Sequence, residues 1–221
     1  MRRPEFIARQ AGCPSGLFGR FFVWIMAAET AAVNEKALEL LELKPNDRVL
    51  EVGFGHGRTL ARAAALVPAG FVAGIDVSEE MVRMARRRNR QCIKEGRVEA
   101  QLADGVRIPY PDECFDRVFA VHTLYFWHDP RVHLQEIYRV MKPGARFVLG
   151  FSPKEDERTV VNFPATVYRF YTSGEVHSMF EEAGFIEVHM VCYQISSRDI
   201  VLGVAHRRTC ESTAAMVKNE S

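Results

Sequence analysis

Three glycines at alternate positions follow a short apolar run. The run Val49–Val52 leads directly into Gly53-Phe54-Gly55-His56-Gly57. Glycine allows tight backbone curvature and lets a ligand lie against main-chain amides. Arg58 stands where the dinucleotide-binding fingerprint needs its third glycine, so the spacing is GxGxG and not GxGxxG. We therefore expect a ligand to bind at this turn, and the spacing argues against a dinucleotide.

Carboxylates follow the next two apolar runs of the chain. Asp76 ends the second run, where it is placed to accept hydrogen bonds from both hydroxyls of a ribose. Asp104 follows the third run, where a carboxylate can meet an adenine amino group. Together with Glu51, these charges repel phosphates and favour a cationic nucleoside. Two simpler interpretations stay open: Asp76 caps the next helix, and Asp104-Gly105 is an ordinary turn.

Strand-like and helix-like segments alternate around these residues. Strands are expected over residues 47–52, 71–77, 97–103, 115–121 and 146–150, and helices over 59–66, 78–94 and 131–141. This alternation is typical of βαβ units, which build a parallel sheet with helices on both faces. A further helix, 173–183, precedes strands 185–193 and 197–206, whose short connection predicts an antiparallel hairpin at the sheet edge.

The chain is predicted to divide into one main domain with smaller appendages. Residues 1–45 are expected to form a helical N-terminal cap or lid, with apolar positions at Ala37, Leu38, Leu40 and Leu41. The ligand-binding domain covers residues 46–206. It contains an insert, 152–172, which is expected to lie on the substrate side of the domain. Residues 207–221 are expected to be a flexible tail.

Five ordered motifs resemble those of class I S-adenosylmethionine-dependent methyltransferases. They are Glu51–Gly57, Asp76, Leu102–Gly105, Phe115-Asp116 and Arg139–Ala145. The similarity runs from about residue 47 to residue 150. It implies a Rossmann-like α/β fold, with a seven-stranded, mostly parallel sheet and one antiparallel edge strand, and S-adenosyl-L-methionine as cofactor.

The resemblance also implies which parts of the cofactor each residue meets. The glycines would face its methionine part, Asp76 its ribose and Asp104 its adenine. The full set of expected cofactor contacts is Glu51, Gly53, Phe54, Gly55, Gly57, Asp76, Val77, Met81, Asp104, Gly105, Ala120 and Val121. Phe54 and His56 depart from the family pattern, and Phe54 is also explained by packing beneath the turn.

Methyl transfer is an in-line displacement, so the main task of the protein is to align a nucleophile. His122, Tyr125 and His128 follow the fourth strand, where they are expected to border the methyl acceptor as catalytic residues. An ordinary histidine pKa of ~6.5 suits a general base. The alternative is that His122 only hydrogen-bonds a neighbouring backbone group. No Asp/His/Glu set indicates a metal-assisted reaction.

Composition limits the partners. Because 29 Lys and Arg nearly balance 28 Asp and Glu, the net charge of +1 gives no general attraction to nucleic acid or anionic lipid. The segment Leu17–Val33 contains Arg20 and Glu29, so no membrane span is expected. Five widely spaced cysteines indicate neither a zinc site nor a disulfide framework. Without a recognisable secretory signal, we expect a cytoplasmic protein, with a homodimer as an open alternative.

The favoured function is transfer of a methyl group to an oxygen, nitrogen or sulfur atom of a small, partly apolar molecule. The family's Asn/Asp-Pro-Pro-Tyr/Phe signature is absent after the fourth strand, which argues against exocyclic amino groups of nucleic acid. Two alternatives remain: a catalytically silent S-adenosylmethionine-binding module and an NAD-dependent oxidoreductase.

Overall fold

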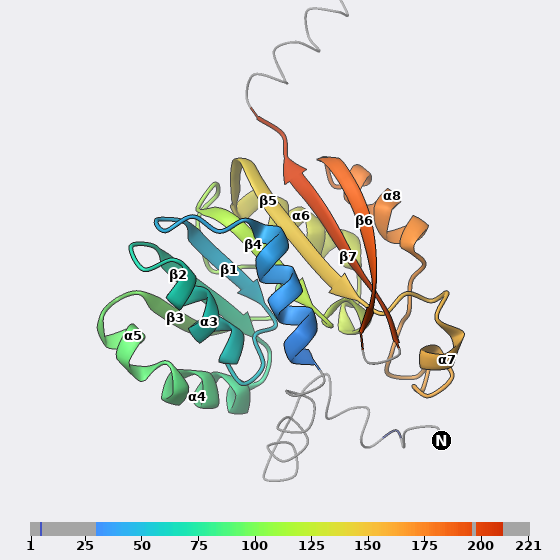
Figure 1. The fold of residues 1–221 in the computed structure, drawn as a ribbon, viewed down its shortest axis with the longest axis horizontal. Coiled ribbons are helices and arrows are strands. Elements are labelled where there is room, and N and C mark those ends of the chain that lie inside the picture. Colours follow the sequence, from blue (N-terminus) through green and yellow to red (C-terminus); the bar gives the residue numbers. More distant parts are fainter. Residues whose placement is uncertain (1–4, 6–29, 196–197, 210–221) are drawn as a thin grey trace, which may run out of the picture.

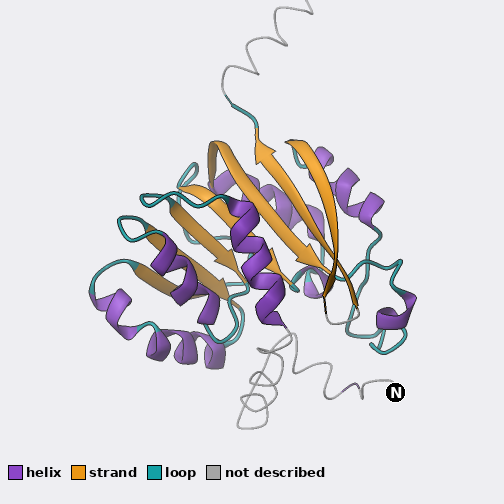
Figure 2. Cartoon of the chain, viewed as in Figure 1, coloured by secondary structure: helices purple, strands orange, loops and turns teal. Residues whose placement is uncertain are grey.

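The computed structural model describes residue 5 and residues 30–195 and 198–209. Seven strands form one sheet: β1 (Arg48–Val52), β2 (Phe71–Asp76), β3 (Val98–Leu102), β4 (Phe115–Val121), β5 (Met141–Phe151), β6 (Phe185–Ile195) and β7 (Arg198–Arg207). The connecting helices are α3 (Arg58–Leu66), α4 (Glu79–Arg88), α5 (Arg90–Lys94), η1 (Leu124–Phe126), α6 (Pro130–Val140), α7 (Glu157–Val160) and α8 (Ser173–Glu182). A further helix covers residues 30–41 (Figure 2).

The sheet has the strand order β3-β2-β1-β4-β5-β7-β6 (Figure 1). Strands β1 to β5 pair in parallel, and β7 pairs antiparallel with both β5 and β6. The expected fold class and the edge hairpin are therefore confirmed, with β7 as the reversed strand and β6 outside it. The strand order reverses between β1 and β4, so their carboxyl ends border the crevice where ligands of such sheets bind.

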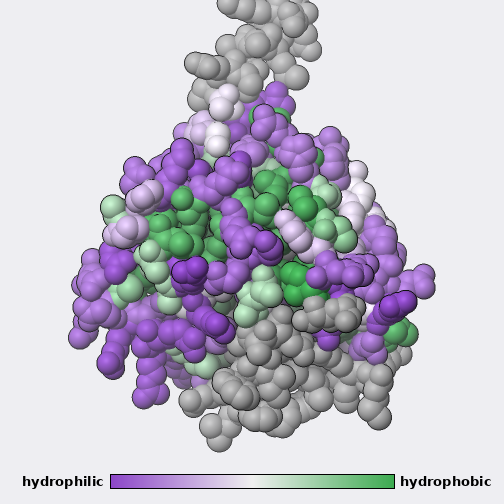
Figure 3. Space-filling view, viewed as in Figure 1, coloured by the Kyte–Doolittle hydropathy of each residue, from purple (hydrophilic) through white to green (hydrophobic). Residues whose placement is uncertain are grey.

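Both faces of the sheet are covered, which explains the nearly continuous apolar character of its central strands. Val118, Phe119 and Ala120 of β4 are all fully buried. The helix over 30–41 packs with α3 and α4 on one face, whereas α6 and α8 pack on the other. The outer surface of α4 stays hydrophilic, at the lower left of Figure 3, where Arg87 and Arg88 are exposed.

The expected helix over 78–94 is two helices, because Asn89 interrupts it. The Asn89 side chain is buried, and its Nδ2 donates hydrogen bonds of 2.9 Å to the carbonyls of Ala85 and Gly57. A contact with the distant glycine turn thus outweighs continuation of the helix. The start of the helix agrees with its sequence, since Ser78 Oγ accepts from the Met81 N–H at 3.3 Å.

Two other boundaries differ from those expected. Strand β5 already begins at Met141, which pairs with Phe115 before a register shift that accommodates Pro143-Gly144. Strand β7 includes Arg207, which the sequence places in the tail. The Arg207 guanidinium donates to the carbonyl of Tyr138 at 3.3 Å and to Glu113 at 2.7 Å, so residue 207 belongs to the folded domain.

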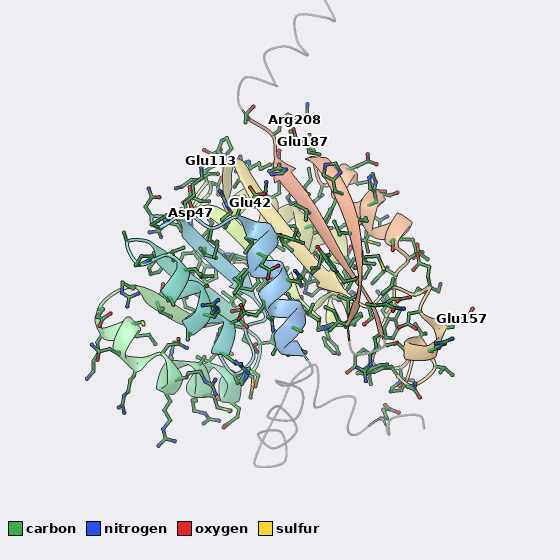
Figure 4. The ribbon with its side chains drawn as sticks, viewed as in Figure 1. Glu42, Asp47, Glu113, Glu157, Glu187 and Arg208 are labelled. Carbon is green, nitrogen blue, oxygen red and sulfur yellow. The ribbon has the colours of Figure 1, made fainter. Side chains whose placement is uncertain are left out.

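Ion pairs gather at the amino end of the parallel strands. They are Arg117–Asp47, Arg146–Glu42, Lys142–Asp116 and Arg207–Glu113. Figure 4 shows Glu42, Asp47 and Glu113 at this end, away from the arrowheads of β1 and β5. Charged side chains therefore stabilise the amino end of the parallel strands, and the carboxyl end remains the place for a ligand.

Part of the expected cap lies within the described chain. Val33, Ala37, Leu38 and Leu41 of the helix over 30–41 are buried against the sheet, and Leu40 is partly buried. This helix is thus part of the hydrophobic core. Positions 1–4 and 6–29 of the expected lid and 210–221 of the expected tail lie outside the described residues. No helix in the described ranges has the length and apolar character that crossing a bilayer requires.

Alanine substitutions at Gly57 and Gly55 should separate packing from backbone strain. Both residues have positive φ, 74° and 55°. A Cβ on Gly57 would lie 2.7 Å from the Ala85 backbone, whereas one on Gly55 meets no atom within 4 Å. We expect Gly55→Ala to lower the free energy of unfolding by ~1 kcal/mol and Gly57→Ala by clearly more. Urea denaturation measures both, and equal losses would contradict this packing.

Candidate functional site

The glycine turn is packed on its inner side and open at its centre. Gly53, Gly55 and Gly57 all adopt positive φ, as the spacing predicts. A Cβ on Gly53 would overlap Thr123, and one on Gly57 would overlap Ala85, but Gly55 faces open space. The Gly53 N–H donates to the carbonyl of Ile75 at 2.8 Å, which fixes the turn to β2. A ligand can therefore approach the main chain at Gly55.

Asp76 connects this turn with the start of α4. Its Oδ2 accepts a hydrogen bond from the Gly55 N–H at 2.8 Å, and its Oδ1 accepts from the Ser78 N–H at 2.9 Å. Burial raises the pKa of Asp76 to about 6, although these amide donors favour its charged form. The structure thus assigns Asp76 a role in holding the turn, and its contact with a ribose stays a prediction.

Glu51 is a buried carboxyl group at the end of β1. It is 4% exposed, and its Oε2 has no hydrogen-bond partner within the described part of the chain. Burial and the neighbouring charge of Asp76 raise the pKa of Glu51 well above its ordinary value, and a hydrogen bond with Thr59 lowers it. A buried carboxyl oxygen without a partner favours binding of a cation or a hydrogen-bond donor from outside the described chain.

Apolar side chains are exposed beside these two carboxylates. Val77 is 48% exposed and Leu102 is 52% exposed. They lie close together, because Asp76 pairs with Leu102 and the Ala103 N–H donates to the Asp76 carbonyl at 3.0 Å. A flat apolar group, such as an adenine ring, can cover them from solvent.

Asp104 lies at the same edge, at the end of β3. It is exposed, and its Oδ1 accepts from the Val106 N–H at 3.0 Å, which is the geometry of a turn. Gly105 has a φ of 77°, and a Cβ there would lie 3.2 Å from the His133 ring. The turn interpretation is therefore correct, and contact of Asp104 with adenine stays a prediction.

His133 is a buried residue that the sequence does not single out. Its ring stacks on Trp127, with centroids 4.8 Å apart. Nε2 lies 3.2 Å from the Asp104 carbonyl, and Nδ1 lies 2.9 Å from the Asp129 carbonyl. His133 thereby holds the Asp104 turn against α6. The sequence gives only a weak signal for this role, an Asp-Pro helix start followed by histidine.

Three expected cofactor contacts have side chains that belong to the core. Phe54, Met81 and Ala120 are 3%, 1% and 0% exposed and pack among apolar neighbours. Phe54 lies against Gly74, so it supports the turn from beneath. Val121 is half-buried and packs against Gly150. Contact of Phe54, Met81 and Ala120 with a cofactor stays a prediction.

His122 and Tyr125 meet directly after β4. The His122 Nδ1 lies 3.1 Å from the Tyr125 hydroxyl, which also accepts a hydrogen bond from the Ser152 N–H. Burial lowers the pKa of His122 to about 4 and raises that of Tyr125 to about 12. Both side chains are consequently neutral near pH 7, and His122 is a much weaker base than the sequence suggests.

His128 does not join this pair. Its side chain is exposed, and its carbonyl accepts a hydrogen bond from the Arg169 guanidinium at 2.9 Å. The Arg169 N–H also donates to the Tyr125 carbonyl at 3.2 Å. His128 thus anchors the insert through its main chain, and no described contact connects its ring with His122 or Tyr125.

An aromatic cluster closes the side of the site next to the insert. Its members are Tyr125, Phe126, Phe163, Tyr168 and Phe170, with neighbouring ring centroids 4.6–6.0 Å apart. Rings at these separations pack favourably in tilted and edge-on arrangements. The cluster fixes the expected insert, 152–172, beside the pair of His122 and Tyr125.

These features fit S-adenosylmethionine, the expected cofactor. The open main chain at Gly55 suits its amino-acid part, and the unpartnered Oε2 of Glu51 suits the ammonium group of that part. The Asp76 carboxylate suits a sugar diol, and the exposed Val77 and Leu102 suit a purine. No phosphate-binding side chain is needed, in agreement with the GxGxG spacing.

Ionisation of Asp76 should destabilise the folded protein. Its pKa rises from 3.8 in the unfolded chain to about 6, so the folded state binds the proton more tightly. The resulting stabilisation is present below pH 4 and is lost as the pH rises through 6, by ~3 kcal/mol. We expect the free energy of unfolding of the ligand-free protein, measured by denaturation across this pH range, to decrease in wild type relative to Asp76→Asn. Parallel pH profiles for the two proteins would contradict the raised pKa.

Comparisons with known proteins agree with this geometry. A family model for a methyltransferase domain matches residues 50–149. The uncharacterized methyltransferase YdaC of Bacillus subtilis is 32% identical over 132 residues, covering 60% of this chain and 71% of that protein. Demethylmenaquinone methyltransferase of Symbiobacterium thermophilum is 39% identical over 200 residues, covering 74% of this chain and 78% of that protein. The crystal structure of a SAM-dependent methyltransferase from Aquifex aeolicus matches with a TM-score of 0.66 and 29% identity. The match covers 78% of this chain and 88% of that protein. The chain therefore belongs to the class I S-adenosylmethionine-dependent methyltransferases.

Proposed function

We propose that this enzyme methylates an oxygen, nitrogen or sulfur atom of a small, partly apolar molecule. The observation that carries the proposal is the neutral pair of His122 and Tyr125, enclosed by the aromatic cluster beside the glycine turn. Thr123 connects the glycine turn with the pair of His122 and Tyr125, since a Cβ on Gly53 would overlap the Thr123 side chain. The acceptor would therefore lie next to the cofactor, against apolar rings with a few polar groups.

The cofactor, when bound, supplies an electrophilic methyl group on a positively charged sulfur. The Gly55 main chain and Glu51 would hold its amino-acid part. Asp76 would hold the ribose, and Val77 with Leu102 would cover the adenine. These residues orient the donor, whereas His122, Tyr125 and the insert position the acceptor and exclude water.

The character of the acceptor is supported by the surroundings and by a relative. Phe126, Phe163 and Phe170 are half-buried, so part of their surface remains for an apolar molecule. The relative from Symbiobacterium thermophilum acts, by its name, on demethylmenaquinone. Nothing in the described ranges gathers three His, Cys, Asp or Glu side chains as a metal site.

Calorimetry and turnover separate this proposal from its alternatives. The proposed enzyme binds S-adenosylmethionine and S-adenosylhomocysteine, whereas an NAD-dependent oxidoreductase would bind NAD. Transfer of a radiolabelled methyl group to a panel of phenols, thiols, amines and carboxylic acids tests catalysis. Cofactor binding without transfer to any acceptor would favour a silent binding module.

Cofactor binding should release protons, because Glu51 has a raised pKa in the ligand-free protein. A bound ammonium group favours the ionised carboxylate, so the proton leaves as the complex forms. Calorimetry at pH ~6 in buffers with different ionisation enthalpies measures the release. Glu51→Gln should lower it and weaken binding, while Glu79→Gln, at an exposed position, should change neither. Equal release by wild type and Glu51→Gln would exclude Glu51 as the proton source.

Replacing His122 should slow transfer without affecting the cofactor. His122 has a φ of 58°, a conformation that Asn tolerates, so His122→Asn should fold and bind S-adenosylmethionine normally. We expect kcat on an acceptor from the panel to fall by ~10-fold or more, because a positioned hydrogen-bonding ring is lost.

The pH dependence of this loss identifies the role of His122. With a pKa of about 4, the ring does not titrate near neutrality, so the ratio of the two kcat values should stay constant from pH ~6 to ~8. A wild-type inflection near pH ~6.5 that His122→Asn removes would instead establish His122 as a general base.

A further inference from the structure

Positive charge is concentrated in residues 83–97, which include most of α4 and all of α5. This segment contains seven of the 29 Lys and Arg residues of the chain. Its single acid, Glu95, pairs with Arg97 at 2.7 Å. Because the whole chain has a net charge of only +1, the other residues together are negative. The charge is therefore unevenly distributed, and a local attraction to anions is compatible with the balanced composition.

Part of this charge is not neutralised within the protein. Arg83 pairs with Glu80 at 2.7 Å, and Arg86 donates to the Ala100 carbonyl at 2.9 Å. Four other cations are exposed and take part in no hydrogen bond or ion pair within the described part of the chain; they are Arg87, Arg88, Arg90 and Lys94. We call these four residues the basic surface. Their charges remain available to an anion from outside.

Helix α4 lies along the carboxyl end of the sheet. At its start, the Ser78 N–H donates to Asp76 at 2.9 Å, and after its end the Asn89 side chain donates to the Gly57 carbonyl at 2.9 Å. Asp76 ends β2 and Gly57 follows β1, so both ends of the helix are held at this edge (Figure 1). The basic surface therefore borders the carboxyl end, where the cofactor site lies.

The insert exposes an apolar side chain at the same end of the sheet. Val161, directly after α7, is 67% exposed. Phe163, two residues further on, packs against Tyr168 in the aromatic cluster. The Arg169 N–H donates to the Tyr125 carbonyl at 3.2 Å, which holds the insert beside the chain that follows β4. An exposed apolar group is thus close in sequence to the rings that border the proposed acceptor site.

The combination of these two features distinguishes among anionic partners. A nucleic acid offers phosphate groups to the basic surface but no apolar layer for Val161. A phospholipid bilayer offers both, since basic residues on an amphipathic helix attract anionic headgroups and apolar side chains enter the boundary with the acyl chains. A partly apolar acceptor also dissolves in a bilayer. The lipid surface is therefore the partner that fits the charge, the exposed valine and the acceptor together.

We propose, resting on the function proposed above, that the carboxyl end of this enzyme docks on an anionic phospholipid bilayer. The basic surface binds the lipid phosphates, and Val161 enters the apolar boundary. The acceptor then passes from the bilayer to the aromatic cluster beside His122 and Tyr125. This docking is peripheral, because no helix in the described ranges is long and apolar enough to cross a membrane.

Cosedimentation of the full chain with vesicles tests the electrostatic part. We expect binding to vesicles of equal parts phosphatidylcholine and phosphatidylglycerol, ~10-fold or weaker binding to phosphatidylcholine alone, and release at ~0.5 M salt, which screens the charges. Arg87→Glu should weaken binding to the anionic vesicles ~10-fold or more. The matched control is Lys44→Glu, which reverses an exposed charge before β1, at the other end of the sheet, and should stay within ~2-fold of wild type.

A second pair of variants tests the apolar contact. Val161→Ser should weaken binding to the same vesicles ~5-fold, because an apolar side chain no longer leaves water. Its control is Leu66→Ser, at the end of α3, where a side chain that is 37% exposed lies away from the carboxyl end. This control should bind as wild type does. Normal thermal unfolding of all four variants excludes loss of the fold as the cause of weak binding.

The proposal is overturned if wild type sediments equally with neutral and anionic vesicles or with neither, or if Arg87→Glu binds the anionic vesicles as wild type does. Tighter binding to bulk transfer RNA than to the anionic vesicles at the same salt also overturns it, because the surface would then serve a nucleic acid. Failure of the proposed function is separate. It appears as absent S-adenosylhomocysteine binding in calorimetry without vesicles, which Arg87→Glu should leave unchanged.

Discussion

The buried carboxylate of Asp76 is the interaction on which the site depends. Its two oxygens accept amide hydrogens from the glycine turn and from the residue before α4. This side chain and the hydrogen bond from the Gly53 N–H to the Ile75 carbonyl together set the position of the turn relative to β2. Burial opposes its charge, so the two amide donors are needed to keep it ionised. The free-energy cost of burying this charge arises at the place where a ligand needs a hydrogen-bond acceptor that is already oriented.

The two ends of the sheet differ. Ion pairs stabilise the amino end, whereas the carboxyl end has groups that a ligand can contact. At the amino end, guanidinium and ammonium groups meet carboxylates, as in the pair of Arg117 with Asp47. At the carboxyl end, Glu51 has an unpartnered oxygen and Leu102 is exposed. Both features cost free energy in the absence of a ligand. Their position at one edge, around a turn that is open at Gly55, distinguishes a binding site from an incompletely packed surface.

The sequence predicts the elements whose signals are local. Alternating apolar runs specify the parallel strands, and Gly53, Gly55 and Gly57 specify positive φ values because other residues adopt them reluctantly. Features that depend on distant partners are not predictable in this way. Asn89 ends a helix because the carbonyl of Gly57 accepts its side-chain hydrogen bond. His122 resembles a general base until its buried surroundings and its contact with Tyr125 are known.

The low basicity of His122 limits the chemistry that this fold can perform. A residue held at a φ of 58° is strained, so the surrounding contacts must favour this conformation. The imidazole is hydrogen-bonded to Tyr125, whose hydroxyl accepts from the N–H of Ser152, the residue that follows β5. Such a ring orients a partner well but gains a proton only at low pH. Rate enhancement must then come from alignment of donor and acceptor and from the local electrostatic potential. Because the chain after β4 meets the glycine turn at Thr123, and β5 ends beside β4, the sheet supplies this alignment directly.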